Sequence, residues 1–327
     1  LATLGSLLGS NFEAVDATVF MVDPNSGATN VTVPSTGAGQ KAGDFDGDRK
    51  ADVSVYRPST GAWWVLKSGA NFQTYSTYGW GLAGDVPAPG DYDGDGKLDL
   101  AIYRPSTGVW WISKSSTNFA TNVSYAWGLG GDVPMPADYD GDGKTDIAIY
   151  RPSNGGWWIL KSSTGFGGYS TYGWGLPGDM PAPGDFDGDG KADPAIYRPS
   201  SGAWWILKSS SNYGAYSTYG WGLTGDLPMA ADFDGDGKTD LAIYRPSTGG
   251  WWILKSSTNF GTYSTYGWGL GGDVPVPGDF DGDGKADPAI FRPTTGGWWI
   301  LKSSANFASY STYGWGLVGD MPVLKRP

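Results

Sequence analysis

Apolar residues in this chain are grouped into short segments separated by Gly, Pro, Ser and Asn. Residues 194–199 and 203–208, which read PAIYRP and AWWILK, are rich in β-branched and aromatic residues, and the turn-forming residues RPSSG join them. These two segments predict a β-hairpin. Residues 216–221 predict a third strand and residues 227–233 a fourth. No window has an apolar period of 3.6 residues over a helical length, so the pattern predicts an all-β fold.

This order of segments repeats along the chain. The string D-[FY]-D-G-D-x-K-x-D recurs every 47 residues without insertion or deletion, beginning at Asp44, Asp91, Asp138, Asp185, Asp232 and Asp279. A fixed period of this length is typical of repeat architectures. Four short strands in each unit of 47 residues are typical of one blade of a β-propeller. The sequence therefore predicts a β-propeller.

The two ends of the chain decide the predicted number of blades. Six full units occupy residues 37–319, and residues 320–327 begin like the innermost strand of another blade. Residues 19–28 align with the hairpin segment but lack the Asp string and the Trp pair. We therefore expect one domain with seven blades, in which residues 1–36 contribute to a degenerate closing blade and residues 320–327 provide its inner strand. Such pairing closes the ring non-covalently and covers two strand edges.

Each Asp string has the composition of a metal-binding loop. Asp at positions 1, 3, 5 and 9 places four carboxylates within reach of one centre, and the backbone carbonyl of the Lys at position 7 adds another oxygen. Oxygen-only coordination favours Ca²⁺, and the absence of His and Cys disfavours zinc and copper. The predicted ligands are Asp44, Asp46, Asp48, Lys50, Asp52, Asp91, Asp93, Asp95, Lys97, Asp99, Asp138, Asp140, Asp142, Lys144, Asp146, Asp185, Asp187, Asp189, Lys191, Asp193, Asp232, Asp234, Asp236, Lys238, Asp240, Asp279, Asp281, Asp283, Lys285 and Asp287.

The charge of the chain agrees with bound cations. Its 33 acidic and 22 basic residues give a formal charge of −11, and 24 of the acids lie in the six loops. Carboxylates crowded together without a cation repel one another. Six Ca²⁺ ions would bring the formal charge to +1, so we expect about six structural ions. Arg49 stands where the other loops have Gly; if this position requires a positive φ, Arg49 is strained and places a cation beside the metal.

Composition also excludes several classes of function. The chain has no Cys and no His, which excludes disulfides, zinc fingers, a thiol nucleophile and an imidazole base. The repeats contain no Glu, and their Asp residues belong to the loops or to a recurring Gly-Asp pair, so we do not expect an enzyme. No apolar run reaches the ~18 residues of a membrane span. Nothing in the pattern indicates a nucleic-acid partner.

The Asp loops resemble those of a known family. The string DFDGDGKAD followed by an apolar strand, in six in-phase copies over residues 37–319, resembles the FG-GAP or VCBS repeats of calcium-binding propellers, including the head of integrin α-subunits. A looser resemblance is to calcium-bearing seven-bladed propeller lectins of fungi and bacteria. The first resemblance implies Ca²⁺ in the loops, and the second implies glycan or glycoconjugate partners. An extracellular or cell-surface location fits loops of this kind, because extracellular modules bind Ca²⁺ at about 10⁻⁴–10⁻³ M.

Each unit contains a Trp pair and a lone Trp. We expect the pair, for example Trp204 and Trp205, to fill the core between blades, because neighbouring residues in a strand face opposite sides. The lone Trp either covers a blade edge or stacks on a sugar ring. The candidate ligand-binding residues are Trp80, Trp127, Trp174, Trp221, Trp268 and Trp315. The second unit has Asn122 and Ala126 where the others have Tyr and Gly, so a site there would be altered. We expect the Arg of each Arg-Pro pair to bind the Gly-Asp carboxylate rather than a ligand.

Two functions from different classes fit these observations. The first is a secreted, calcium-stabilised binding module, a multivalent lectin or adhesion protein in which repeated weak sites act together. The second is a structural extracellular protein, such as a filament, appendage or surface-layer subunit, that self-associates through its terminal strands. Residues 1–12 would then complete the closing blade in the same molecule or in a neighbour. The near-identity of the repeats does not discriminate, because recent duplication alone would produce it.

Overall fold

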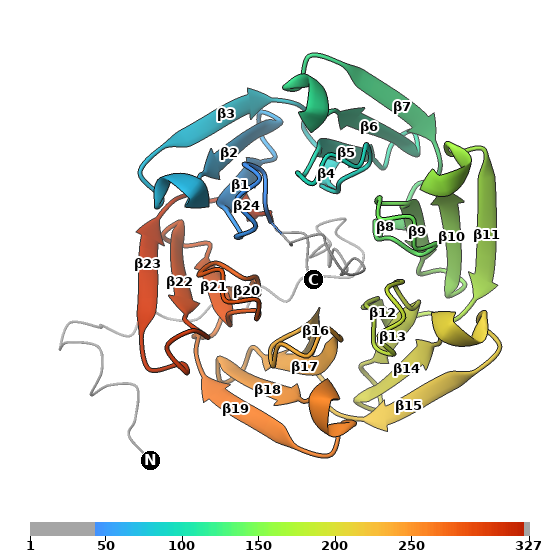
Figure 1. Cartoon of the computed structure of the whole chain (residues 1–327), viewed down its shortest axis with the longest axis vertical. Helices are drawn as coiled ribbons and strands as arrows, with labels where there is room; N and C mark the ends of the chain where they lie inside the picture. The colour runs from blue at the N-terminus through green and yellow to red at the C-terminus, as the bar shows by residue number, and fades with distance from the viewer. Residues whose placement is uncertain (1–42, 324–327) are drawn as a thin grey trace.

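The computed structural model describes residues 43–323, and these residues form six antiparallel sheets of four strands around a ring (Figure 1). Each sheet is one blade, with its first strand near the axis and its last strand at the rim. A β-propeller is therefore confirmed. Its core lies between the blades, as the repeat pattern predicts.

The strands recur in the same order in each blade, and blades 1 to 5 each have a short 3-10 helix before the outer strand. Blade 1 contains β24 (Met321–Pro322), β1 (Val53–Arg57), β2 (Ala62–Leu66) and β3 (Tyr75–Gly79); blade 2 contains β4 (Val86–Pro87), β5 (Leu100–Arg104), β6 (Val109–Ser113) and β7 (Asn122–Ala126); blade 3 contains β8 (Val133–Pro134), β9 (Ile147–Arg151), β10 (Gly156–Lys161) and β11 (Gly168–Gly173). Blade 4 contains β12 (Met180–Pro181), β13 (Ala195–Arg198), β14 (Ala203–Leu207) and β15 (Tyr216–Gly220); blade 5 contains β16 (Leu227–Ala231), β17 (Asp240–Arg245), β18 (Gly250–Leu254) and β19 (Tyr263–Gly267); blade 6 contains β20 (Val274–Pro275), β21 (Ala289–Arg292), β22 (Gly297–Leu301) and β23 (Tyr310–Gly314). The 3-10 helices are η2 (Ser68–Ala70), η3 (Ser115–Thr117), η4 (Ser162–Thr164), η5 (Ser209–Ser211) and η6 (Ser256–Thr258).

The prediction of seven blades is wrong, because the C-terminal strand completes the first blade. β24 pairs antiparallel with β1, with Met321 opposite Tyr56 and Pro322 opposite Val55. The amide of Val323 then donates to the carbonyl of Ser54 at 2.8 Å. Among the described residues 43–323, no inner strand precedes the first Asp loop, and β24 from the C-terminal segment takes that position. Residues 1–36, which the sequence assigned to a closing blade, lie outside the described residues.

The length of the inner strands follows from proline. In β4 the ladder ends at Pro87, and a second proline, Pro89, follows two residues later. Proline has no N–H to donate, so Pro89 interrupts the ladder, and pairing resumes only as an isolated bridge between Gly90 and Asp99. β16 has Ala230 at the position of that second proline and continues to Ala231, five residues in all.

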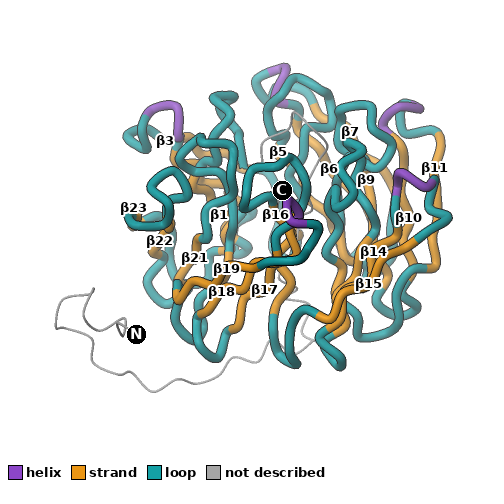
Figure 2. Tube along the Cα trace, turned by 60° about the horizontal axis from the view of Figure 1, so that its bottom comes forward, coloured by secondary structure: helices purple, strands orange, loops and turns teal. Residues whose placement is uncertain are grey.

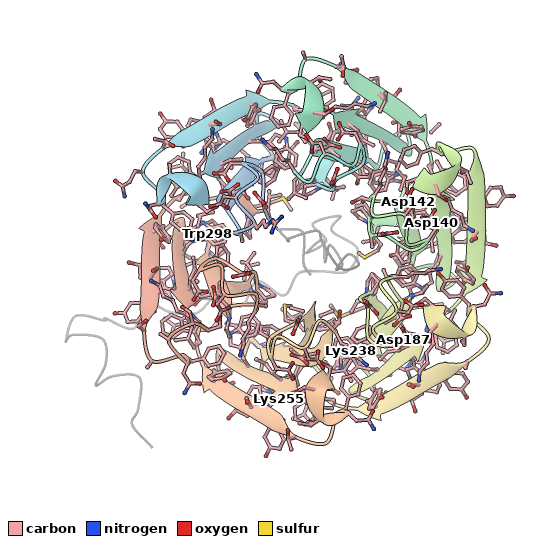
Figure 3. The ribbon with its side chains drawn as sticks, in the orientation of Figure 1. Asp140, Asp142, Asp187, Lys238, Lys255 and Trp298 are labelled. Atoms are coloured by element: carbon pink, nitrogen blue, oxygen red, sulfur yellow. The ribbon has the colours of Figure 1, made fainter. Side chains whose placement is uncertain are left out.

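The first Trp of each pair forms the centre of the core. Trp63, Trp110, Trp157, Trp204, Trp251 and Trp298 are completely buried. Trp298 and Ile300 of blade 6 pack in one cluster with Val53 and Val55 of blade 1, and Figure 3 labels Trp298 within the ring of side chains. The expected inter-blade core is therefore confirmed for the first Trp, whereas the second Trp of each pair is only half-buried. No helix among residues 43–323 has the length and apolar character needed to cross a bilayer.

Candidate functional site

The six Asp loops, residues 44–52, 91–99, 138–146, 185–193, 232–240 and 279–287, are numbered here as loops 1 to 6. In loop 2, the chain folds around the carboxylate of Asp91. Its Oδ1 accepts a hydrogen bond from the amide of Gly94 at 2.6 Å, and its Oδ2 accepts one from Gly96 at 2.9 Å. Both glycines have a positive φ, 82° and 87°, which residues with a side chain rarely adopt. The D-x-x-G-D-G spacing therefore creates a tight loop whose first carboxylate is already held in place.

The ninth residue of each loop anchors the loop to the hairpin. Asp99 is fully buried, and its Oδ2 accepts from the amide of Tyr92 at 2.9 Å. Its Oδ1 accepts from both the amide and the hydroxyl of Ser115, each at 2.7 Å. The equivalent serines are Ser68, Ser162, Ser209, Ser256 and Ser303. Sequence analysis missed these residues, although a Lys-Ser dipeptide recurs after every Trp pair.

A second serine orients the third residue of the loop. The hydroxyl of Ser116 donates to Oδ2 of Asp93 at 2.6 Å. Ser163, Ser210, Ser257 and Ser304 make the same contact in loops 3 to 6. In loop 1 this position is Gly69, whose amide reaches Asp46 at 3.1 Å instead. The other oxygen of Asp93 is thereby turned towards the interior of the loop.

Three carboxylates of a loop converge on one point. One oxygen from each of Asp91, Asp93 and Asp99 lies within 4.8 Å of the other two, and loops 3, 4 and 5 bring together the same three positions. Figure 3 shows Asp140 of loop 3 and Asp187 of loop 4 at neighbouring places around the ring. The buried Oδ1 atoms of Asp93, Asp187 and Asp234 have no hydrogen-bond partner. An unpaired buried oxygen costs about 1–3 kcal/mol, so a cation at this point would satisfy it.

The fifth and seventh residues are placed differently from the first, third and ninth. In loop 2, Oδ1 of Asp95 accepts from the amide of Lys97 and from the hydroxyl of Ser115, each at 2.9 Å. The converging group of loop 2 contains the carboxylates of positions 1, 3 and 9, whereas that of loop 1 contains Asp44, Asp46 and Asp48. Metal ligation by the fifth carboxylate and by the Lys carbonyl stays a prediction.

Burial makes the ninth carboxylate difficult to ionise without a cation. Loss of solvent raises the pKa of Asp52, Asp99, Asp146, Asp193, Asp240 and Asp287 to about 7, although their hydrogen bonds from serine oppose the shift. The same cause raises the pKa of Asp185 to about 6. A divalent cation favours the ionised form of each carboxylate that it contacts. The donor set of oxygens fits Ca²⁺.

Loop 1 keeps its fold despite Arg49. This residue has a φ of 72°, in the left-handed region, so the condition under which the sequence analysis expects strain is met. Its amide still donates to Oδ2 of Asp44 at 2.7 Å, as Gly96 does to Asp91 in loop 2. Loop 1 therefore keeps the amide contact of the other loops with a strained backbone at Arg49.

The arginines of the hairpins are engaged in ion pairs. Arg104 donates from Nε and Nη2 to the two carboxylate oxygens of Asp85, both at 2.8 Å. The corresponding pairs are Arg57–Asp320, Arg151–Asp132, Arg198–Asp179, Arg245–Asp226 and Arg292–Asp273. Each guanidinium also lies over the second Trp of its blade, with 4.1–5.7 Å between the guanidinium carbon and the ring centroid. The expected pairing of Arg with the Gly-Asp carboxylate is confirmed.

The lone Trp of each blade connects that blade to the next. Nε1 of Trp127 donates to the carbonyl of Trp158 in blade 3 at 3.2 Å, and its ring lies 5.4 Å from that of Tyr169. The other five lone Trp residues make the same hydrogen bond at 3.2–3.3 Å. All six are half-buried. They are therefore packing residues with one accessible surface, and sugar binding by them stays a prediction.

Exposed tyrosines extend these contacts into surface aromatic clusters, each containing the lone Trp of one blade and the outer-strand Tyr of the next. The five tyrosines are Tyr75, Tyr169, Tyr216, Tyr263 and Tyr310, which are 46–64% exposed. Their rings lie 5.2–5.4 Å from the neighbouring lone Trp. Asn122 occupies the equivalent position beside Trp80, so the junction between blades 1 and 2 lacks the Tyr.

A small pocket of about 240 Å³ lies on another part of the junction between blades 6 and 1. Phe72, Phe280, Ile300 and Tyr313 form its apolar lining. Lys50, Asp281 and Lys302 add charged groups at the same place. Its volume is smaller than the roughly 300–1,000 Å³ of typical small-molecule sites.

Comparison with known proteins identifies the repeat. The model of the FG-GAP-like repeat family matches residues 44–102, 91–149 and 232–290, about half of the chain. A search of the curated proteins finds no match. Among solved structures, a lectin of Agrocybe aegerita that recognises non-reducing terminal N-acetylglucosamine aligns with a TM-score of 0.51 and 16% identity, covering 76% of this chain and 72% of the lectin. A catalytically inactive virginiamycin B lyase from Staphylococcus aureus aligns with a TM-score of 0.45 and 11% identity, covering 84% and 88% of the two chains. At 16% identity, the alignment with the lectin shows that the two proteins have a similar fold and nothing more.

Proposed function

The chain belongs to the FG-GAP-like repeat family, and we propose that it is a calcium-stabilised β-propeller that binds carbohydrate at repeated surface sites outside the cell. In this proposal the loops hold the ions that keep the blades in place, and the surface aromatic clusters bind the ligand. We propose no catalytic role, because the carboxylates described above are held in loops or in ion pairs with arginine.

The observation that carries the calcium proposal is the unpaired oxygen inside the loops. Asp93, Asp187 and Asp234 each have a buried Oδ1 without a hydrogen-bond partner, and each of these side chains belongs to a group of three converging carboxylates. Both oxygens of Asp91 accept hydrogen bonds from loop amides, and those of Asp99 accept from the amide of Tyr92 and from Ser115, so these side chains are held in place before an ion arrives. A bound Ca²⁺ would supply positive charge at that point, while the loop amides and serines orient the ligands.

The carbohydrate proposal is supported by the surface aromatic clusters. Aromatic faces bind the apolar C–H groups of sugar rings, and five junctions present an exposed Tyr beside a half-buried Trp. Repetition of one weak site on a rigid ring gives avidity for a polymeric surface, which can exceed the single-site affinity by about 10²–10⁴. The likeness to the Agrocybe aegerita lectin adds that a propeller of related fold recognises a sugar.

The alternative, a structural protein assembled through its terminal strands, has less support. β24 is already paired with β1 of its own ring, so it is not available for donation to a neighbour. Residues 1–12, the other proposed assembly segment, lie outside the described residues.

Binding to immobilised glycans tests the carbohydrate proposal. The calcium-loaded protein is applied to a glycan array that includes N-acetylglucosamine polymers, together with the triple variant Tyr169→Ala, Tyr216→Ala and Tyr263→Ala. We expect the triple variant to lose retention and to keep its melting temperature, because these side chains are about 60% exposed. The matched control replaces Leu129, Leu176 and Leu223 by Ala; these side chains have similar exposure but are not part of the aromatic clusters. Equal retention of the two triple variants, or no binding by the parent chain, would refute the proposal.

A further inference from the structure

The six Asp loops are joined to one another by a closed series of backbone hydrogen bonds. In each case the carbonyl of the first Asp of one loop accepts from the amide of the eighth residue of the next loop. The bonds are Leu98 to Asp44, Thr145 to Asp91, Ala192 to Asp138, Thr239 to Asp185, Ala286 to Asp232 and Ala51 to Asp279, at 2.7–2.9 Å. The last of these connects loop 6 back to loop 1, so the series has no end within the ring.

These bonds lie directly beside the proposed metal ligands. Thr145 is the residue between Lys144 and Asp146 of loop 3, and its acceptor Asp91 provides the first carboxylate of loop 2. Thr145 and Asp146 are completely buried, so the bond is shielded from water. A hydrogen bond between buried groups is expensive to break, because each group would be left without a partner. A change of position at Asp91 is therefore transmitted to the peptide that precedes Asp146.

Side chains reinforce the connection between loops. The aliphatic part of Lys144 lies over Gly94 of loop 2, where an added Cβ would come within 2.7 Å of its Cε. Lys97, Lys191, Lys238, Lys285 and Lys50 occupy the same place over Gly47, Gly141, Gly188, Gly235 and Gly282. Each loop is therefore covered by a residue of the next one.

At four junctions, the residue before one loop is complementary in size to the eighth residue of the next loop. Gly90 faces Thr145 and Gly184 faces Thr239; a Cβ on either glycine would come within 2.6–2.7 Å of the threonine methyl group. At two junctions where the eighth residue is the smaller Ala, the residue before the preceding loop is also Ala: Ala137 and Ala192 belong to one core cluster, and Ala231 and Ala286 to another. Between loops 6 and 1 the corresponding residues are Gly278 and Ala51. The glycine–threonine pairs leave no room for a further carbon atom between the two residues.

We propose that the six loops bind Ca²⁺ as one coupled ring, in which an ion in one loop raises the affinity of the two flanking loops. The proposal rests on the proposed calcium function and adds how the sites act together. An ion that fixes Asp91 also fixes the carbonyl that holds Thr145, so loop 3 loses less conformational freedom when its own ion binds. The charge of the first ion opposes this effect, but salt screens charges beyond about 8 Å at physiological ionic strength.

Calcium titration of the ion-free protein tests the coupling. We expect a sigmoidal isotherm by isothermal calorimetry, which persists when ionic strength is raised from 0.15 M to about 0.5 M because hydrogen bonds transmit the effect. The variant with Asp140→Asn and Asp142→Asn disables loop 3. We expect the flanking loops 2 and 4 to bind about five-fold or more weakly, since coupling energies are typically of this size. Independent sites would instead leave their affinity unchanged.

Junction variants show whether the loop contact is the cause. Gly90→Ala should flatten the isotherm, because the new Cβ separates loop 2 from Thr145. Adding Thr145→Ala recreates the Ala–Ala pair present between loops 3 and 4 and should restore the sigmoidal shape. If Gly90→Ala fails to fold, the double variant and the loop 3 variant still decide the question.

The outcomes separate the two proposals. No calcium binding by the parent chain overturns both the calcium function and the coupling. Binding of several ions with a Hill coefficient of about 1 overturns the coupling alone. A sigmoidal isotherm that Gly90→Ala leaves unchanged also overturns it, because the coupling would then follow another route.

Discussion

Arg57 and Asp320 form a bidentate ion pair across 263 residues of sequence, with both nitrogen–oxygen distances at 2.8 Å. The side chain of Asp320 is 1% exposed and that of Arg57 22%. Arg104 and Asp85 form the same pair within blade 2, where they are only 19 residues apart. The C-terminus therefore supplies the carboxylate that the first unit lacks, and this pair fixes the register of β24 on β1.

A chain that ends at Gly319 should lose ring closure, because β1 would present an unpaired edge where Met321 and Pro322 now lie. We expect a lower urea midpoint and the formation of oligomers in size-exclusion chromatography. A chain that ends at Val323 retains β24 and is the control. Asp320→Ala keeps β24 but removes the ion pair and the hydrogen bond from the amide of Leu317, and it should cost about 1–3 kcal/mol, less than breaking a fully buried pair because Arg57 is partly hydrated. Equal stability of the two truncated chains would show that β24 does not close the ring.

Removal of calcium should lower the melting temperature. A site with a Kd of about 10⁻⁴ M adds about 2.7 kcal/mol at 100-fold excess of free ion. Metal analysis should find about six ions per chain, and Asp93→Asn should reduce the number by about one.

In the ion-free state the variant Asp93→Asn should be no less stable than the parent chain, because it neutralises a carboxylate with an unpaired buried oxygen. Fewer than about three ions, or an unchanged melting curve in excess chelator, would contradict the prediction.

Stability should depend on pH in opposite directions with and without calcium. Burial raises the pKa of Asp99 and its five equivalents to about 7, from 3.8 in the unfolded chain. Between these values the folded ion-free protein binds more protons than the unfolded one, so its free energy of unfolding falls as pH rises from about 4 to 7. Calcium competes with those protons, so the calcium-induced stabilisation should grow over the same range. Melting temperatures at pH 5 and pH 8, measured on protein stripped by a chelating resin and on calcium-loaded protein, check both signs. A calcium effect that is equal at the two pH values would contradict the assignment of Asp99 as a ligand.

The blade and its core could be predicted from the sequence, because both depend on local patterns repeated six times. A period of 47 residues with four strand segments fixes the propeller, and alternation along the strand assigns Trp63 to the core. The blade count could not be predicted in the same way. Residues 320–322 have the sequence of an inner strand and carry no signal for the blade that they join. That choice depends on how the ring closes in three dimensions.

The ligand set was predictable only in part. The Asp spacing indicates a metal loop, but the spacing alone does not distinguish Asp95 from Asp93. The Oδ1 of Asp95 accepts hydrogen bonds from Lys97 and Ser115, whereas the Oδ1 of Asp93 has no hydrogen-bond partner. The difference arises because Ser115 and Ser116 come from the far end of the hairpin and contact the loop from outside. Contacts between residues 16 to 23 positions apart depend on the strand register, which a motif does not contain.

The strain at Arg49 gives a further prediction. Arg49→Gly should increase the free energy of unfolding by up to about 1 kcal/mol and raise the melting temperature modestly. The reason is that φ is 72° at this position, and glycine adopts this region without steric cost. The same change removes a cation near the carboxylates of loop 1 and should strengthen calcium binding there. The reciprocal variant Gly96→Arg places an equivalent strain and charge in loop 2 and should have both opposite effects. Calorimetry of the two variants with and without calcium compares them directly. If both variants lower stability by the same amount, the left-handed backbone is not the cause.

The junction between blades 1 and 2 allows a gain-of-function test of the carbohydrate proposal. Asn122 is opposite Ser113 at the position that Tyr75 occupies opposite Leu66 in blade 1, and it leaves Trp80 without the aromatic partner found at the other junctions. Asn122→Tyr should complete a sixth aromatic cluster and increase retention on a glycan matrix, because one more weak site adds to the avidity of the ring. The fold should tolerate the change, since Tyr favours strands and the position is exposed. Asn122→Leu is the control, because it adds apolar surface without a ring that can stack on a sugar. If Asn122→Tyr and Asn122→Leu increase retention equally, general hydrophobicity explains the binding; if neither changes retention, the lone Trp and its Tyr neighbour are packing residues only.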